Sequence, residues 1–158
     1  MTAIQTVESG LPITVYTGED VAVDGTGSYP GQYAQYVSGA NASNVGMSHP
    51  NRQAEVNQFF NTGAFVNPND EPLGTYGNSS KGIVYGPAYA DTDASLLKDF
   101  ALPEKFRLQF RAESFNTFNQ VNFSNPNSYA NAGTAFGQIQ STVAGTGRQL
   151  QLALKLLW

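Results

Sequence analysis

The sequence predicts an all-β fold, an antiparallel meander of strands with one long irregular loop region. Side chains on a strand alternate between its two faces, and segment 150–158 places four leucines and a tryptophan on one face. The opposite face holds three polar residues and one alanine: Gln149, Gln151, Ala153 and Lys155. Charged residues make up only 13% of the chain and glycines number 16. Because runs of helix-favouring residues are missing, we expect almost no helix.

A second segment, 106–113, sorts its residues in the same way. Its apolar residues occupy one face, and its charged and amide residues occupy the other: Phe106, Leu108, Phe110 and Ala112 against Arg107, Gln109, Arg111 and Glu113. Segment 93–100 upstream has the same pattern in weaker form. Pro103 lies between the two segments, and proline favours turns and cannot donate to a ladder. We therefore predict a hairpin with a tight turn near Pro103.

Strands that are apolar on one face and polar on the other suit a membrane barrel, with lipid on one side and a polar lumen on the other. An aromatic residue at the end of the last strand, Trp158, fits the same picture. A half-buried edge strand of a soluble β-sandwich shows the same alternation and remains the alternative. No stretch of about 18 apolar residues occurs, so we expect no transmembrane helix.

Three zones follow along the chain. Residues 1–16 contain short strands, residues 17–87 form a long polar loop region, and residues 88–158 return to antiparallel strands with a Gly-rich hairpin at 144–147. Loops longer than about 12–15 residues are uncommon in compact domains, but they are normal on the extracellular side of a large barrel. The chain is therefore expected to be a single domain or a fragment of a larger barrel.

Charge and cysteine content exclude several classes. The formal net charge is -4, which argues against a nucleic-acid partner because such proteins need a basic surface. The chain has no cysteine, so it has neither disulfides nor thiolate metal ligands. Its first residues lack the basic and apolar regions of a signal peptide. For an exported protein, the export signal is then expected upstream.

Several motifs together resemble a known family. They are the segments 59–65, 74–78, 85–87, 106–113, 115–123, 125–127, 137–139, 145–151 and 153–158. In combination they resemble the carboxyl-terminal barrel segment of TonB-dependent outer-membrane receptors. The most similar type is the Oar-like, carboxypeptidase-regulatory-domain-bearing type common in Acidobacteria. The resemblance is dense from about residue 59 onward and diffuse before it.

The resemblance implies a bacterial outer-membrane location and a role in nutrient uptake or surface ligand binding. It also implies two partners, the remainder of a barrel and the barrel-assembly machinery, whose signal the last strand resembles. Ala153 stands where that signal often has glycine. Such receptors close a barrel of about 22 strands around a plug, whereas this sequence offers roughly six to eight strands. The plug and the TonB box have no counterpart here.

Candidates for chemistry are few. His49 is the one histidine and lies beside a proline, and no serine-nucleophile or phosphate-loop motif is present. Asp91 and Asp93 lie at a loop-to-strand junction, where carboxylates two residues apart suit Ca²⁺. The catalytic candidates are therefore Asp91, Asp93 and His49, and the metal candidates are Asp91 and Asp93. Ca²⁺ is the one cofactor that the sequence raises.

Aromatic residues of the loop region suggest ligand contact. Tyrosine rings offer a large contact area to organic ligands such as glycans or other small molecules. The ligand-contact candidates are Tyr29, Tyr33 and Tyr36, with loop packing as the alternative. Tyr85 and Tyr89 are expected in the aromatic girdle at a membrane interface.

Three functions remain open. The first is a barrel segment of a TonB-dependent receptor. The second is a small stand-alone hydrolase, Ca²⁺-dependent, acting on an amphiphilic ester or lactone. The third is a non-enzymatic binding or adhesion module.

Overall fold

The computed structural model describes residues 1–25 and 30–158. The chain divides into two compact units. The sheet unit comprises residues 1–9, 88–122 and 142–158, and the loop unit comprises residues 10–87 and 123–141. Each unit thus combines segments that are far apart in the sequence.

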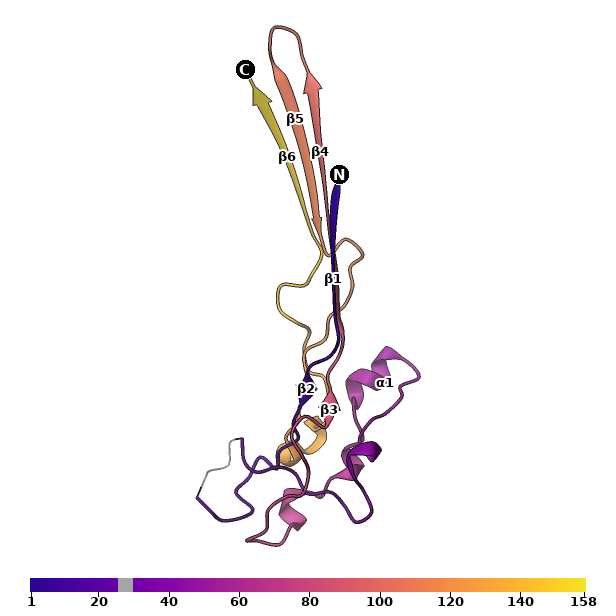
Figure 1. The fold of residues 1–158 in the computed structure, drawn as a ribbon, viewed down its shortest axis with the longest axis vertical. Coiled ribbons are helices and arrows are strands. Elements are labelled where there is room, and N and C mark those ends of the chain that lie inside the picture. Colours follow the sequence, from indigo (N-terminus) through magenta and orange to yellow (C-terminus); the bar gives the residue numbers. More distant parts are fainter. Residues whose placement is uncertain (26–29) are drawn as a thin grey trace. The chain divides into compact units, whose positions relative to one another are not determined.

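Four antiparallel strands form the sheet unit, in the order β1-β4-β5-β6, and Figure 1 shows them side by side. Their bounds are Thr2–Glu8 for β1, Tyr89–Ala101 for β4, Arg107–Phe115 for β5 and Gln149–Leu157 for β6. The all-β, antiparallel prediction is confirmed. Strands β4, β5 and β6 follow one another as a meander, whereas β1 joins the free side of β4 from the other end of the chain.

Helix is scarce, as predicted. In residues 1–25 and 30–158 the α-helix is α1 (Arg52–Asn57), which has six residues. The described part of the chain also contains four 3-10 helices: η1 (Ala42–Asn44), η2 (Thr62–Ala64), η3 (Pro68–Asp70) and η4 (Ala130–Ala135). None of the helices in these ranges is both long and apolar enough to cross a membrane.

The hairpin between β4 and β5 confirms the predicted turn near Pro103. The backbone N–H of Leu102 donates to the carbonyl of Phe106 at 2.9 Å. Glu104 and Lys105 have positive φ angles of 60° and 72°. Two consecutive residues with positive φ are typical of the primed turns that match the right-handed twist of paired strands.

The register places most of the large apolar residues of β4, β5 and β6 on one face, because directly paired residues of neighbouring strands point to the same side. Leu154 pairs with Phe110, and Leu152 pairs with Ala112, which pairs with Leu96. Lys98, opposite Phe110, is the charged residue on this side. We call this side the apolar face: Ala3, Val7, Ala94, Leu96, Phe100, Leu108, Phe110, Ala112, Leu150, Leu152, Leu154 and Leu156 with Lys98, Gln5, Thr92 and neighbouring small residues.

The predicted Gly-rich hairpin at 144–147 is wrong. The strand that follows it, β6, pairs with β5, from Gln149 opposite Phe115 to Leu157 opposite Arg107. Segment 142–148 is held by the loop after β5 instead, because Asn116 donates its side-chain amide to the carbonyl of Thr146. A side-chain contact of this kind leaves no trace in the alternation of apolar residues.

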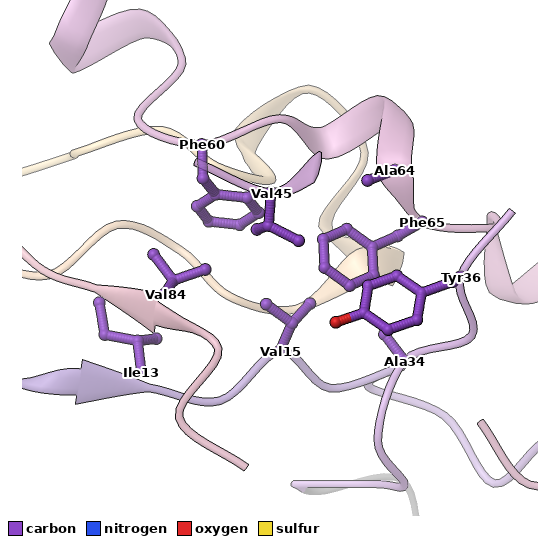
Figure 2. Packing of buried hydrophobic residues seen from close by; sticks show 9 residues of the cluster. All are labelled: Ile13, Val15, Ala34, Tyr36, Val45, Phe60, Ala64, Phe65 and Val84. Atoms are coloured by element: carbon purple, nitrogen blue, oxygen red, sulfur yellow. The ribbon is translucent and has the colours of Figure 1, made fainter. Parts of the chain in front are cut away.

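The loop unit is irregular in backbone but has a packed core. Besides the short helices it contains β2 (Pro12–Ile13) and β3 (Val84–Tyr85), which pair with each other. Phe60, at the centre of the core, is only 1% exposed. Figure 2 shows the core side chains converging from separate segments: Ile13, Val15, Ala34, Tyr36, Val45, Phe60, Ala64, Phe65 and Val84. The long polar region expected at 17–87 therefore supplies most of a hydrophobic core.

Asparagine side chains begin the short helices of the loop unit. Asn51 accepts the backbone N–H of Ala54 at the start of α1, at 2.9 Å. Asn41 and Asn67 do the same for η1 and η3. Asparagine favours such caps because its side-chain oxygen reaches backbone donors that the helix leaves unpaired.

Candidate functional site

The apolar face of the sheet carries large side chains that the chain itself leaves uncovered. Leu150, Leu152 and Leu154 are 74%, 73% and 67% exposed. A contiguous exposed apolar surface marks a contact with another protein or with a membrane. Lys98 is compatible with such a contact, because it lies near the end of β4 and a lysine stem can extend its charge toward water.

The opposite face, which we call the polar face, carries charged and amide side chains together with exposed apolar residues, among them Ile4 and Leu97. Arg111 forms an ion pair with Glu113 within β5, and Gln109 donates to the carboxylate of Asp99 on β4 at 2.9 Å. The four residues in these contacts all have odd numbers, and the odd-numbered residues of β4 and β5 share one face of the sheet. The sheet thus separates an apolar surface from a hydrogen-bonded polar one across its own thickness.

Asp91 and Asp93 both lie on β4 and face the polar side, at the end of the strand away from the hairpin. Asp93 accepts the backbone N–H of Asn116 at 3.0 Å, and Asp91 accepts that of Thr92 at 2.9 Å. Asn116 has a positive φ of 46°, so the Asp93 carboxylate holds the tight turn after β5. In the ranges that the structure describes, no three carboxylates or histidines gather closely enough to hold a metal ion.

Tyrosines of the loop unit form a row across three backbone segments. Tyr16 bridges to Tyr33 on one side and to Tyr129 on the other. The ring centroids of Tyr16 and Tyr33 are 5.9 Å apart, and those of Tyr16 and Tyr129 are 6.0 Å apart. Backbone hydrogen bonds of 2.8 to 3.1 Å fix the register, among them those from Thr17 to Gln32 and from Ala34 to Val15.

Beside this row lies a cavity of about 480 Å³, which we call the tyrosine pocket. Tyr76, 64% exposed, lines it from a segment 52 residues after Asp24 and donates its hydroxyl to Asp24 at 2.9 Å. The lining residues are Tyr16, Asp24, Gly31, Gln32, Tyr33, Tyr76 and Gly77. A volume of this size, lined by aromatic rings and a few polar groups, is typical of a small-molecule site.

Asp24 also shapes the electrostatics of the tyrosine pocket. Its hydrogen bond with Tyr76, its negative charge, a little burial and the charge of Asp20 together raise the pKa of the Tyr76 phenol. A carboxylate that accepts a hydrogen bond from the phenol O–H favours the neutral phenol. The Tyr76 side chain in the tyrosine pocket is therefore a neutral phenol that is hydrogen-bonded to Asp24.

The three predicted ligand-contact tyrosines have different fates. Tyr33 lines the tyrosine pocket. Tyr36 does not, because its ring is 9% exposed and stacks on Phe65 in the core, with centroids 5.3 Å apart (Figure 2). Tyr29 lies outside the described residues. Periodicity does not separate Tyr33 from Tyr36, because an irregular chain has no fixed period.

His49 lies in a second cavity of the loop unit, about 520 Å³ in volume, which we call the His49 pocket. Its ring stacks on Phe59 with centroids 6.0 Å apart, and its Nε2 lies 2.7 Å from the carbonyl oxygen of Gln58. Ser43 and Glu55 line the same cavity. The Ser43 hydroxyl donates to Asn41 at 2.6 Å. His49 and Ser43 are therefore each hydrogen-bonded to a different residue and do not form a serine–histidine pair.

Burial also perturbs one acid of the loop unit. Glu71 is 7% exposed, and within the described ranges neither of its carboxylate oxygens has a hydrogen-bond partner. Burial raises the pKa of this carboxyl, and the nearby backbone of Gln35 lowers it in part. A buried carboxyl favours its neutral form because a low-dielectric surrounding disfavours the charge.

Comparison with protein families decides the class of the molecule. A family model described as an outer membrane beta barrel domain matches residues 1–151. The chain belongs to this family. It is therefore an outer-membrane β-barrel protein. The apolar and polar sides of the antiparallel sheet agree with the strands of such a barrel, which meet lipid on one side and a lumen on the other. No match was found among curated proteins, and none among solved structures.

Sequence reasoning missed several pocket residues. Tyr16 joins Tyr33 in the tyrosine pocket, and Ser43 and Glu55 join His49. Tyr76, one of the aromatic residues of the loop region, also lines the tyrosine pocket. One available signal was glycine, since a Cβ on Gly77 would lie 1.8 Å from the carbonyl oxygen of Tyr33. Such close backbone approach brings the neighbouring Tyr76 to the pocket, but the sequence alone does not say which segment approaches.

Proposed function

We propose that this chain supplies barrel strands of a TonB-dependent receptor that takes up a nutrient across the outer membrane. The single observation that carries the proposal is the sorting of β5 and β6 into an apolar and a polar face, which most residues of β4 continue. The motif resemblance to the carboxyl-terminal barrel segment of such receptors supports the TonB-dependent type. Membership of the outer-membrane barrel family supports the barrel itself.

A barrel that includes this sheet needs further strands. Strands β1 and β6 lie at its two edges, and unpaired N–H and C=O groups in lipid are too costly to persist. The remainder of a barrel is therefore the partner of both edges. Strand β6, with its alternating leucines and Trp158, is the segment that we propose the barrel-assembly machinery recognises.

Ligand contact is assigned in this proposal to the loop unit, at the tyrosine pocket. Its supports are the row of Tyr16 and Tyr33, the exposed ring of Tyr76 and the carboxylate of Asp24. In an outer-membrane barrel, long loops on the outer side meet the ligand before the lumen does. Replacing Tyr33 with alanine should then weaken ligand binding while leaving barrel insertion intact.

The absence of cysteine from the sequence permits a direct test of the barrel placement. Single cysteines at Leu152 and Leu154 should resist a water-soluble maleimide in whole membranes, because they face hydrocarbon. Single cysteines at Gln151 and Ala153 should react, because they face the lumen. Labelling without alternation between odd and even positions would refute the placement of β6.

TonB dependence needs a separate experiment on the full-length receptor in bacteria. Uptake of the nutrient on which the cells grow should fall to background in cells that lack TonB, while binding at the cell surface persists. The Tyr33→Ala variant should reduce both binding and uptake. Uptake that is unchanged without TonB would leave the barrel standing and remove the TonB-dependent assignment.

A further inference from the structure

The His49 pocket combines apolar walls with a small set of polar groups. Phe60 and Val84 belong to the buried core, and Phe59 and Ile83 pack against that core. The volume of about 520 Å³ lies within the range of pockets that bind small molecules. Its polar groups therefore decide which class of molecule fits.

The imidazole of His49, which lines the pocket, has one nitrogen that can act as an acceptor. Its Nε2 lies 2.7 Å from the carbonyl oxygen of Gln58, so Nε2 must be the nitrogen that carries the proton. In the neutral ring the other nitrogen, Nδ1, then has a lone pair and no proton. The stacked ring of Phe59 holds the imidazole in this orientation.

Ser43 and Glu55, which line the same cavity, also offer acceptors. The Ser43 hydroxyl donates its one proton to Asn41 at 2.6 Å, which leaves lone pairs on its oxygen. Glu55, on α1, carries a carboxylate that accepts only. Among the residues that the structure describes, no lysine or arginine lines the cavity and no ion pair joins Glu55 to a cation.

We propose that the His49 pocket binds a primary ammonium ion that carries an apolar, ring-sized body. An ammonium group has three N–H donors and no acceptor, which complements Nδ1 of His49, the hydroxyl oxygen of Ser43 and the carboxylate of Glu55. Phe59 and Tyr85 offer ring surface to the apolar body and to the positive charge.

Ligands of other charge fit less well. A carboxylate or phosphate would bring acceptors to a lining whose described side chains are mostly acceptors, with the Tyr85 phenol as a donor, and it would meet the charge of Glu55. A neutral alcohol has one O–H donor, whereas the pocket has three acceptor groups, on His49, Ser43 and Glu55. The ammonium site goes beyond the proposed receptor function, because binding here does not require transport.

The test uses the full-length protein in detergent micelles and three probes of similar shape: 2-phenylethylammonium, 2-phenylethanol and phenylacetate. Isothermal titration calorimetry at neutral pH should show the ammonium binding at least about tenfold more tightly than the alcohol, which corresponds to about 1.4 kcal/mol. Phenylacetate should show no binding. Equal or tighter binding of phenylacetate or of the alcohol would overturn the proposal.

A variant locates the binding at this cavity. Glu55→Gln keeps the shape of the side chain and removes its charge, so ammonium affinity should fall roughly tenfold or more. Glu19→Gln makes the same change in the loop unit outside the pocket and should leave affinity unchanged. Equal losses in both variants would show that general surface charge, and not this site, attracts the probe.

The outcome stays interpretable if Glu55→Gln does not fold, because the three-probe series on the unmodified protein decides the charge preference by itself. It also stays separate from the receptor function. Loss of TonB-dependent uptake with intact ammonium binding removes only the transport assignment, and the reverse result removes only this site.

Discussion

Replacing Leu154 with arginine tests the membrane face of the sheet most directly. Leu154 is the sixth of the nine residues of β6, directly opposite Phe110. At about 3.4 Å per residue and a tilt of roughly 40°, β6 spans roughly 23 Å, close to the apolar band of about 25 Å. Leu154 then lies only about 3 Å from the middle of that band.

Near the bilayer midplane an arginine on the lipid face costs about 2–4 kcal/mol, and we expect this loss for Leu154→Arg. Gln151→Arg is the matched control, because position 151 lies on the polar face of the same strand. It is paired with Glu113, so the new charge meets an acid. Its effect should stay within about 0.5 kcal/mol.

Folding of the full barrel into lipid vesicles, followed by urea titration, measures both free energies. The reasoning about the two faces fails if the arginines at 154 and 151 destabilise the barrel equally. It also fails if Gln151→Arg is the more harmful of the two.

Three further predictions concern the rest of the molecule. The hydrolase alternative requires that Ca²⁺ raise the unfolding midpoint, and that Asp91→Asn or Asp93→Asn abolish both this shift and the turnover of an ester or lactone. We expect neither shift nor turnover, because the Asp93 carboxylate already accepts a backbone N–H. Calorimetry with and without chelator measures the shift. Gly77→Ala places a Cβ 1.8 Å from the carbonyl oxygen of Tyr33 and should cost about 1–3 kcal/mol, seen as a lower midpoint in denaturant with loss of ligand binding. Burial raises the pKa of Glu71 above its ordinary value of 4.5, so the folded state holds this proton more tightly than the unfolded chain and stability falls as pH rises above about 4.5. Glu71→Gln should therefore stabilise the protein at neutral pH, with a difference that disappears below pH 4, and unchanged pH profiles would contradict the burial argument.

The sequence predicts best the strands that pair with the next strand along the chain. Strands β5 and β6 sort their residues with period 2, because one side of the sheet meets an apolar medium and the other meets water. The alternation that these two surroundings require can be seen in the sequence of each strand by itself. The fold class, the hairpin at Pro103 and the two faces therefore follow from local pattern alone.

The loop unit could not be predicted in this way. Phe60, Phe65 and Tyr36 come together from segments without regular period, and their burial depends on contacts between distant parts of the chain. The same is true of the pockets. Tyr76 reaches Asp24 across 52 positions of sequence, so no spacing rule connects them.

By itself, then, the sequence determined the alternating strands, the near absence of helix and the charge balance, since each depends on a residue and its near neighbours. Only the tertiary structure decided that Tyr33 is available to a ligand while Tyr36 is buried. It also decided that His49 shares a cavity with Glu55 and that Asp93 anchors a turn. The physical reason is that exposure, hydrogen-bond partners and cavities belong to the packed arrangement of distant segments, and side-chain chemistry at one position does not contain them.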